Sequence, residues 1–122
     1  MKGLLVFFGG GLGALIRYFL YLILPSSAYF PLGTLVANFF GCFIATIVFM
    51  YFMLKADMDN SAKTFLITGF CGGLSTLSAL SLELLQFFRM GDYTRAIYYI
   101  IASTVVCSVA VLFGLVLVKH FN

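Results

Sequence analysis

The sequence has little charge and few of the residues that supply enzymatic chemistry. Only 9% of its 122 residues are charged, tryptophan is absent, and histidine occurs once. That histidine, His120, lies at the C-terminal end, where we expect it to be solvated. Because no nucleophile is paired with a base, the sequence offers no basis for an enzyme. The cysteines Cys42, Cys71 and Cys107 lack metal-ligand spacing and are interpreted as small packing residues.

Apolar residues make up 63% of the chain, and its mean hydropathy is +1.13. No water-soluble domain needs so much apolar surface, so the sequence predicts an all-α integral membrane protein of the cell membrane. A bilayer core takes about 20 helical residues. Windows of that length lie at about residues 3–24, 32–54, 65–88 and 96–118, which predicts one transmembrane domain of four helices over residues 1–122. Nothing in the composition indicates a nucleic-acid surface.

The few basic residues bear on the orientation of the chain in the membrane. Four spans place both termini on one side. The basic residues then divide into Lys2, Lys55, Lys63 and Lys119 on the side of the termini and Arg89 and Arg95 on the other side. The positive-inside rule favours cytoplasmic termini. Because this bias is slight, insertion in both orientations is also compatible with the sequence.

The first span contains glycines and an arginine. Gly9 and Gly13 form a GxxxG pair, which lets a neighbouring backbone approach closely. Arg17 is costly within a span, by at least ~2.5 kcal/mol on insertion scales. It either snorkels towards Pro25 at the span end or has a buried partner. That partner would be a carboxylate, backbone carbonyls or a permeating anion.

The second and fourth spans carry polar side chains at helical spacing. Thr34 and Asn38 share one face of the second span. Asn38 is either a partner in an interhelical hydrogen bond or an amide whose two N–H donors face an aqueous path. The second span also has a stripe of small residues, which predicts a tight helix contact, at Gly33, Ala37, Gly41 and Ala45. The fourth span has a weakly polar stripe of Tyr99, Ser103 and Cys107.

Residues 69–83, in the third span, contain glycines, hydroxyls and a carboxylate where a plain span has Leu and Val. The adjacent Gly72 and Gly73 predict a break in the helix. Such a break is tolerated at membrane depth only where protein or a water-filled cavity satisfies the freed backbone. Ion sites are often built at such half-helix ends, and exposed carbonyls suit a small hard cation. If helix resumes after Gly73, one face carries Thr76, Leu80 and Glu83.

Three motifs in the first three spans resemble the signatures of the Fluc (CrcB) fluoride channels. They are GGGLGALIRY at residues 9–18, GTLVANFFG at residues 33–41 and GFCGGLST at residues 69–76. Their order, the chain length and the number of spans also fit that family. The resemblance implies an antiparallel, dual-topology dimer with two narrow pores that export F⁻ and relieve fluoride toxicity. It also implies a structural Na⁺ at the dimer interface.

The resemblance assigns roles to particular residues. The carbonyls of Gly72 and Ser75 would bind the Na⁺. Asn38 corresponds to the family's pore asparagine, and Arg17 to an arginine of the first signature. The implied fluoride pathway comprises Arg17, Thr34, Asn38, Ser75, Thr76, Leu77, Ser78, Leu80, Glu83, Tyr99 and Ser103.

The sequence departs from the family at its third motif. Ser75 replaces the first of two threonines, and Leu77 and Leu80 stand where the family has two phenylalanines that line the pores. An aromatic ring edge is electropositive and can face an anion, whereas leucine offers no such edge. Either the chain forms a homodimeric channel with a tolerated variation, or it pairs with a paralogue that keeps the phenylalanines. We favour the heterodimer.

Two other functions fit parts of the sequence. A small proton-coupled multidrug exporter needs a membrane carboxylate, for which Glu83 is the candidate. A non-transporting membrane assembly subunit would explain the glycines. It would not explain Arg17, Asn38 and the predicted break together.

Overall fold

The computed structural model describes residues 1–24, 30–55 and 59–122, and its elements are helices. The loops predicted after the first and second spans lie partly outside these residues. The elements are α1 (Lys2–Ile23), α2 (Leu32–Leu54), α3 (Asn60–Lys63), the π-helical η1 (Thr64–Cys71), α4 (Gly72–Leu74), α5 (Leu77–Arg89) and α6 (Tyr93–Phe121).

Four helical stretches in the described part of the chain are long and apolar enough to cross a membrane. They are Lys2–Ile23, Leu32–Leu54, Asn60–Arg89 and Tyr93–His120. The prediction of an all-α membrane protein with a broken third span is therefore confirmed. The fourth helix begins earlier than predicted because the preceding turn is tight. Gly91 has a φ of +70° there, and the Asp92 side chain caps α6 by accepting a hydrogen bond from the Arg95 N–H at 3.0 Å.

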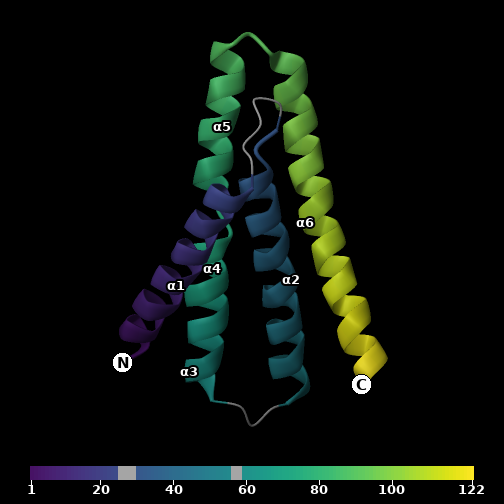
Figure 1. The fold of residues 1–122 in the computed structure, drawn as a ribbon. Helices are drawn as coiled ribbons and strands as arrows, with labels where there is room; N and C mark the ends of the chain where they lie inside the picture. The colour runs from purple at the N-terminus through teal and green to yellow at the C-terminus, as the bar shows by residue number, and fades with distance from the viewer. Residues whose placement is uncertain (25–29, 56–58) are drawn as a thin grey trace.

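The helices form an open bundle in which both termini lie at the same end (Figure 1). α3 lies at that end too, whereas the turn between α5 and α6 marks the opposite end (Figure 1). α1 crosses the third span, and α2 lies between that span and α6. The predicted division of basic residues between the two ends is thus confirmed. Lys2, Lys55, Lys63 and Lys119 belong to the end with the termini.

Glycines allow α1 to contact the backbone of the third span. A Cβ atom at Gly9 would lie 2.6 Å from the Phe65 carbonyl oxygen. A Cβ atom at Gly13 would lie 2.7 Å from the Leu74 nitrogen and still closer to the Phe70 carbonyl oxygen. The close approach predicted from the GxxxG pair is confirmed, with η1 and α4 as the neighbours.

The break in the third span lies at Ser75 and Thr76, three residues later than the predicted Gly72 and Gly73. Gly72 is helical, with φ −64° and ψ −34°, whereas Ser75 and Thr76 are extended. Gly73 serves close packing, because a Cβ atom there would overlap the Gly10 carbonyl. Thr76 therefore does not share a helical face with Leu80 and Glu83. It is the N-cap of α5, and its Oγ1 accepts a hydrogen bond from the Ala79 N–H at 3.2 Å.

The stripe of small residues on α2 makes the predicted tight contacts. Gly33 packs against the Tyr21 ring of α1, and Ala37 is fully buried. A Cβ atom at Gly41 would lie 2.8 Å from the Ser75 Cβ atom. α2 therefore lies directly beside the break.

We predict that Gly13→Ala destabilises the protein, because the added methyl group meets backbone atoms that cannot rotate away. Overpacking of this kind costs about 1–3 kcal/mol or more. The measurement is the midpoint of thermal unfolding in detergent. Gly11→Ala is the matched control, since a Cβ atom there meets nothing within 4 Å. Equal midpoints for the two variants would contradict the proposed packing of α1.

Candidate functional site

Asn38 pairs with the backbone of Thr76 at the break. The Thr76 N–H donates to Asn38 Oδ1 at 2.6 Å, and Asn38 Nδ2 donates to the Thr76 carbonyl at 3.3 Å. The interhelical hydrogen bond considered for Asn38 is therefore present. Of the two N–H donors that the alternative places on an aqueous path, one is bonded to the Thr76 carbonyl, so only the other is left for the cavity that Asn38 lines.

The break releases backbone carbonyls from their helical partners. In an unbroken helix the Thr76 N–H would bond to the Gly72 carbonyl, and the Ala79 N–H to the Ser75 carbonyl. Here Thr76 donates to Asn38, and Ala79 donates to the Thr76 side chain. The carbonyls of Gly72 and Ser75 thereby lose the bonds that a continuous helix would give them.

Arg17 binds a third carbonyl at the end of α4. Its Nε donates to the Gly73 carbonyl oxygen at 3.2 Å. Of the partners considered for Arg17, the structure thus shows a backbone carbonyl. A cation at a helix C-terminus is also favoured by the helix dipole. Arg17 therefore joins α1 to the broken span immediately before the break.

A cavity of about 320 Å³ opens beside the break, between α2, α5 and α6. It is lined by Asn38, Cys42, Ser75, Thr76, Leu77, Leu80, Ser103, Thr104 and Cys107. Among the described residues, the Ser103 hydroxyl is buried without a hydrogen-bond partner. The cavity therefore combines an apolar wall with hydrogen-bond donors from Asn38 and Ser103, a combination that suits a small anion.

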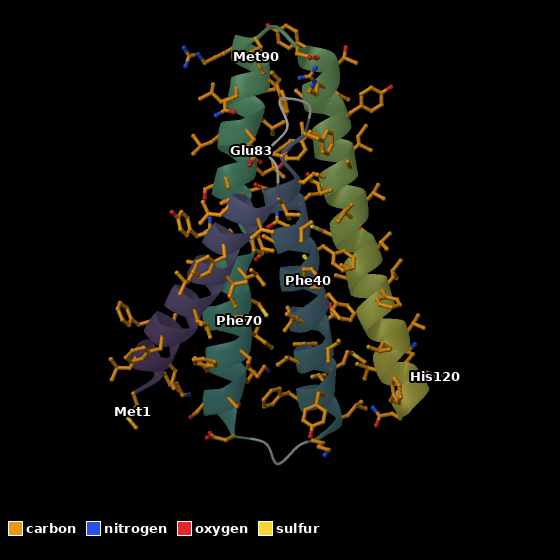
Figure 2. All side chains as sticks on the ribbon, in the orientation of Figure 1. Met1, Phe40, Phe70, Glu83, Met90 and His120 are labelled. Atoms are coloured by element: carbon orange, nitrogen blue, oxygen red, sulfur yellow. The ribbon has the colours of Figure 1, made fainter. Side chains whose placement is uncertain are left out.

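A second polar cluster surrounds Glu83, which lies on α5 between the break and the turn marked by Met90 (Figure 2). Thr34 Oγ1 donates to one Glu83 oxygen at 2.5 Å, and the Tyr99 hydroxyl donates to the other. The Tyr21 hydroxyl lies 2.9 Å from Thr34 Oγ1. Because Thr34 gives its single hydrogen to Glu83, Tyr21 must donate to Thr34.

The structure divides the predicted site residues between the cavity and the Glu83 cluster. The cavity brings together Asn38, Ser75, Thr76, Leu77, Leu80 and Ser103, whereas Glu83, Thr34 and Tyr99 form the second cluster. Ser78 is exposed and contacts the Thr76 hydroxyl at 3.0 Å. Sequence reasoning missed Tyr21, whose position four residues after Arg17 on α1 was the available signal. It also missed Cys42, Thr104 and Cys107 as cavity residues.

Comparison with known proteins identifies the family. The profile described as CrcB-like protein, Camphor Resistance (CrcB), matches residues 4–115. This chain belongs to the CrcB family. The matched residues extend from α1 into α6, so they include the Arg17 contact, the break, the cavity and the Glu83 cluster. Among the positions considered for function, only the terminal His120 lies outside the match.

Relatives of this CrcB chain are named as fluoride-specific ion channels FluC. The protein of Azobacteroides pseudotrichonymphae is 37% identical over 98% of both chains. That of Pyrococcus abyssi is 40% identical over 96% of this chain and 95% of its own. That of Hydrogenobaculum is 39% identical over 87% of this chain and 88% of its own. The chain is therefore a multi-pass membrane protein of an ion-channel family and not an enzyme.

We predict that Tyr99→Phe destabilises the CrcB chain, because it leaves one oxygen of the half-buried Glu83 without its donor. A buried acceptor without a partner costs about 1–3 kcal/mol. The measurement is the shift in thermal midpoint in detergent. Tyr98→Phe is the matched control, since Tyr98 is 66% exposed on the same helix whereas Tyr99 is fully buried. A drop of equal size in both variants would show that the bond to Glu83 does not matter.

Proposed function

We propose that this chain is a subunit of a fluoride-selective channel that lets F⁻ leave the cytoplasm down its electrochemical gradient. The observation that carries the proposal is the cavity beside the break, where Asn38 and Ser103 offer donors. Fluoride is small and strongly hydrated, so hydrogen-bond donors must replace its water as it enters a narrow path. The names of the relatives support the same ion.

Two rows of polar side chains connect the cavity with the Glu83 cluster. Asn38 follows Thr34 by one turn of α2, and Ser103 follows Tyr99 by one turn of α6. One turn of helix rises about 5.4 Å. These rows support a path from the cavity along α5 towards the end of the molecule that carries the α5–α6 turn.

A structural Na⁺ fits the carbonyls that the break releases. Gly72 and Ser75 are the residues that would hold it, through their backbone oxygens. Carbonyl oxygens are the ligands that hard cations prefer. An antiparallel dimer would present this pair twice, giving four oxygens around a central ion. The bound Na⁺ would neutralise the partial negative charge of these carbonyls and join the subunits.

The surface around Leu77 supports a second subunit. Leu77 is 76% exposed at the cavity, and the neighbouring Ser78 and Ser81 are also exposed. Hydroxyls in the middle of a span are better covered by protein than by lipid. Neither Leu77 nor Leu80 supplies an aromatic edge to the path. We therefore propose a heterodimer with a CrcB paralogue that carries phenylalanines, with a homodimer as the alternative.

The decisive measurement is F⁻ efflux from liposomes that contain this chain alone, read with a fluoride electrode. Chloride efflux is the selectivity control, and replacement of Na⁺ by N-methylglucamine tests the sodium site. On the heterodimer proposal the chain alone gives little efflux. Addition of a CrcB subunit with both phenylalanines then gives rapid, fluoride-selective efflux that depends on Na⁺.

The other outcomes separate the parts of this proposal. Rapid fluoride-selective efflux from the chain alone would establish a homodimeric channel and contradict the need for a paralogue. Efflux that is indifferent to Na⁺ would count against the sodium site. Absence of F⁻ efflux from folded protein, with and without such a partner, would contradict the channel function.

We predict that Asn38→Asp lowers F⁻ efflux by at least about 100-fold, equivalent to about 2.7 kcal/mol in the barrier. The substitution replaces the donor to the Thr76 carbonyl with an acceptor and adds negative charge beside the cavity. The rate is measured in the vesicle preparation that conducts. Thr46→Val is the matched control, since the Thr46 hydroxyl donates to the Cys42 carbonyl of its own helix. Retained efflux in Asn38→Asp would leave Asn38 as a packing residue.

A further inference from the structure

Two thiols face the cavity one helical turn beyond its polar donors. α2 and α6 run side by side in the same direction (Figure 1). Asn38 and Ser103 line the cavity, and so do Cys42 and Cys107, each four residues further along its helix. Both are free cysteines with half-buried side chains, and they lie close enough to influence each other. The register of the two helices therefore places a pair of thiols, and not a single cysteine, in one accessible cavity.

The proposed passage of fluoride makes little use of these thiols. An S–H group is a weak hydrogen-bond donor, so Cys42 and Cys107 add little to the binding of a hard anion. Sulfur is instead a soft ligand that selects soft metal ions. The pair therefore has a chemistry of its own, separate from that of Asn38 and Ser103.

The surroundings of the pair restrict which metal ion it would bind. Zn²⁺ takes four protein ligands in structural sites. The described residues contain no group of three or more His, Cys, Asp or Glu side chains placed to hold a metal. Cu⁺ between two thiolates would leave a net negative charge, and none of the described residues that line the cavity is cationic. A divalent ion that prefers two thiolates in a linear arrangement, as Hg²⁺ does, would leave no net charge.

We propose that Cys42 and Cys107 form a two-thiolate site for a soft divalent cation, with Hg²⁺ as the matching ion. On binding, two S–H bonds break, two Hg–S bonds form, and two protons leave to water. No electron is transferred, so no oxidant is needed. The neutral product suits a cavity that is mostly apolar.

The bound ion would lie across the proposed fluoride path. It would bridge α2 and α6 one turn from Asn38 and Ser103, within the same cavity. Hg²⁺ should therefore block F⁻ efflux, and this consequence rests on the proposed function. The binding of Hg²⁺ to the two thiols does not rest on that function.

Binding is tested with purified protein and one equivalent of HgCl₂ in the presence of a competing monothiol. After desalting, retained mercury is measured by mass spectrometry. We expect one Hg²⁺ per wild-type chain and at least tenfold less in Cys42→Ser and in Cys107→Ser, since one thiol cannot hold the ion against the competitor. Alanine variants at both positions provide a second pair if a serine variant does not fold. Cys71→Ser is the matched control, because Cys71 does not line the cavity.

Three results would overturn the site. One is that either single variant retains as much mercury as the wild-type protein. Another is that the wild-type protein retains none. The third is an equal loss in Cys71→Ser, which would show that the ion is not held by Cys42 and Cys107 alone.

The efflux assay then separates the site from the channel function. In conducting vesicles we expect Hg²⁺ to stop F⁻ efflux from wild type and from Cys71→Ser, with recovery on addition of a dithiol chelator. In the Cys42 and Cys107 variants, Hg²⁺ should leave F⁻ efflux at the rate that the same variant shows without Hg²⁺. If mercury retention needs both thiols but untreated vesicles show no F⁻ efflux, the result would support the mercury site and contradict the channel function. Undiminished efflux with Hg²⁺ bound would contradict the position of the site across the path.

Discussion

The pairing of Asn38 with Thr76 is the interaction on which the site depends. An extended peptide in the middle of a membrane span exposes an N–H and a C=O that water cannot reach, at several kcal/mol for each group. The primary amide of Asn38 offers one acceptor and one donor with the spacing of another peptide, so it satisfies both groups of Thr76 at once. An aliphatic side chain at this position would leave both groups without partners. The break, the cavity and the freed carbonyls all depend on this pairing of Asn38 with Thr76.

The close approach of α1 complements this pairing from the other side of the third span. Because Gly9 and Gly13 have no side chains, α1 lies against the backbone of η1 and α4. This proximity brings the Arg17 Nε within 3.2 Å of the Gly73 carbonyl. The cost of a guanidinium within a span is thus offset by a bond to a carbonyl that the break has released. Gly73, which could have supplied flexibility, instead supplies room for α1.

Hydropathy and spacing predicted the spans and the close helix contacts, because both properties are local in the sequence. The position of the break could not be predicted in the same way. It is set by a hydrogen bond between residues 38 positions apart, and the Arg17 contact joins residues 56 positions apart. The sequence predicts the break at Gly72 and Gly73, because a glycine pair in the sequence does not reveal whether it provides flexibility or space. Cys42 and Cys107 were assigned to packing because only the register of α2 and α6 brings them together.

The arrangement of the cavity also bears on what leucine, in place of phenylalanine, would change at positions 77 and 80. The hydrogen-bond donors come from α2 and α6, which pack against each other within one chain, whereas Leu77 projects from α5 and is largely exposed. On the proposed function, donors that replace the water of the anion and side chains that could offer it an aromatic edge would therefore come from different helices. A chain that keeps its donors and loses its phenylalanines can still build the donor side of a path. On the proposed heterodimer, the partner subunit supplies the aromatic side where it covers Leu77.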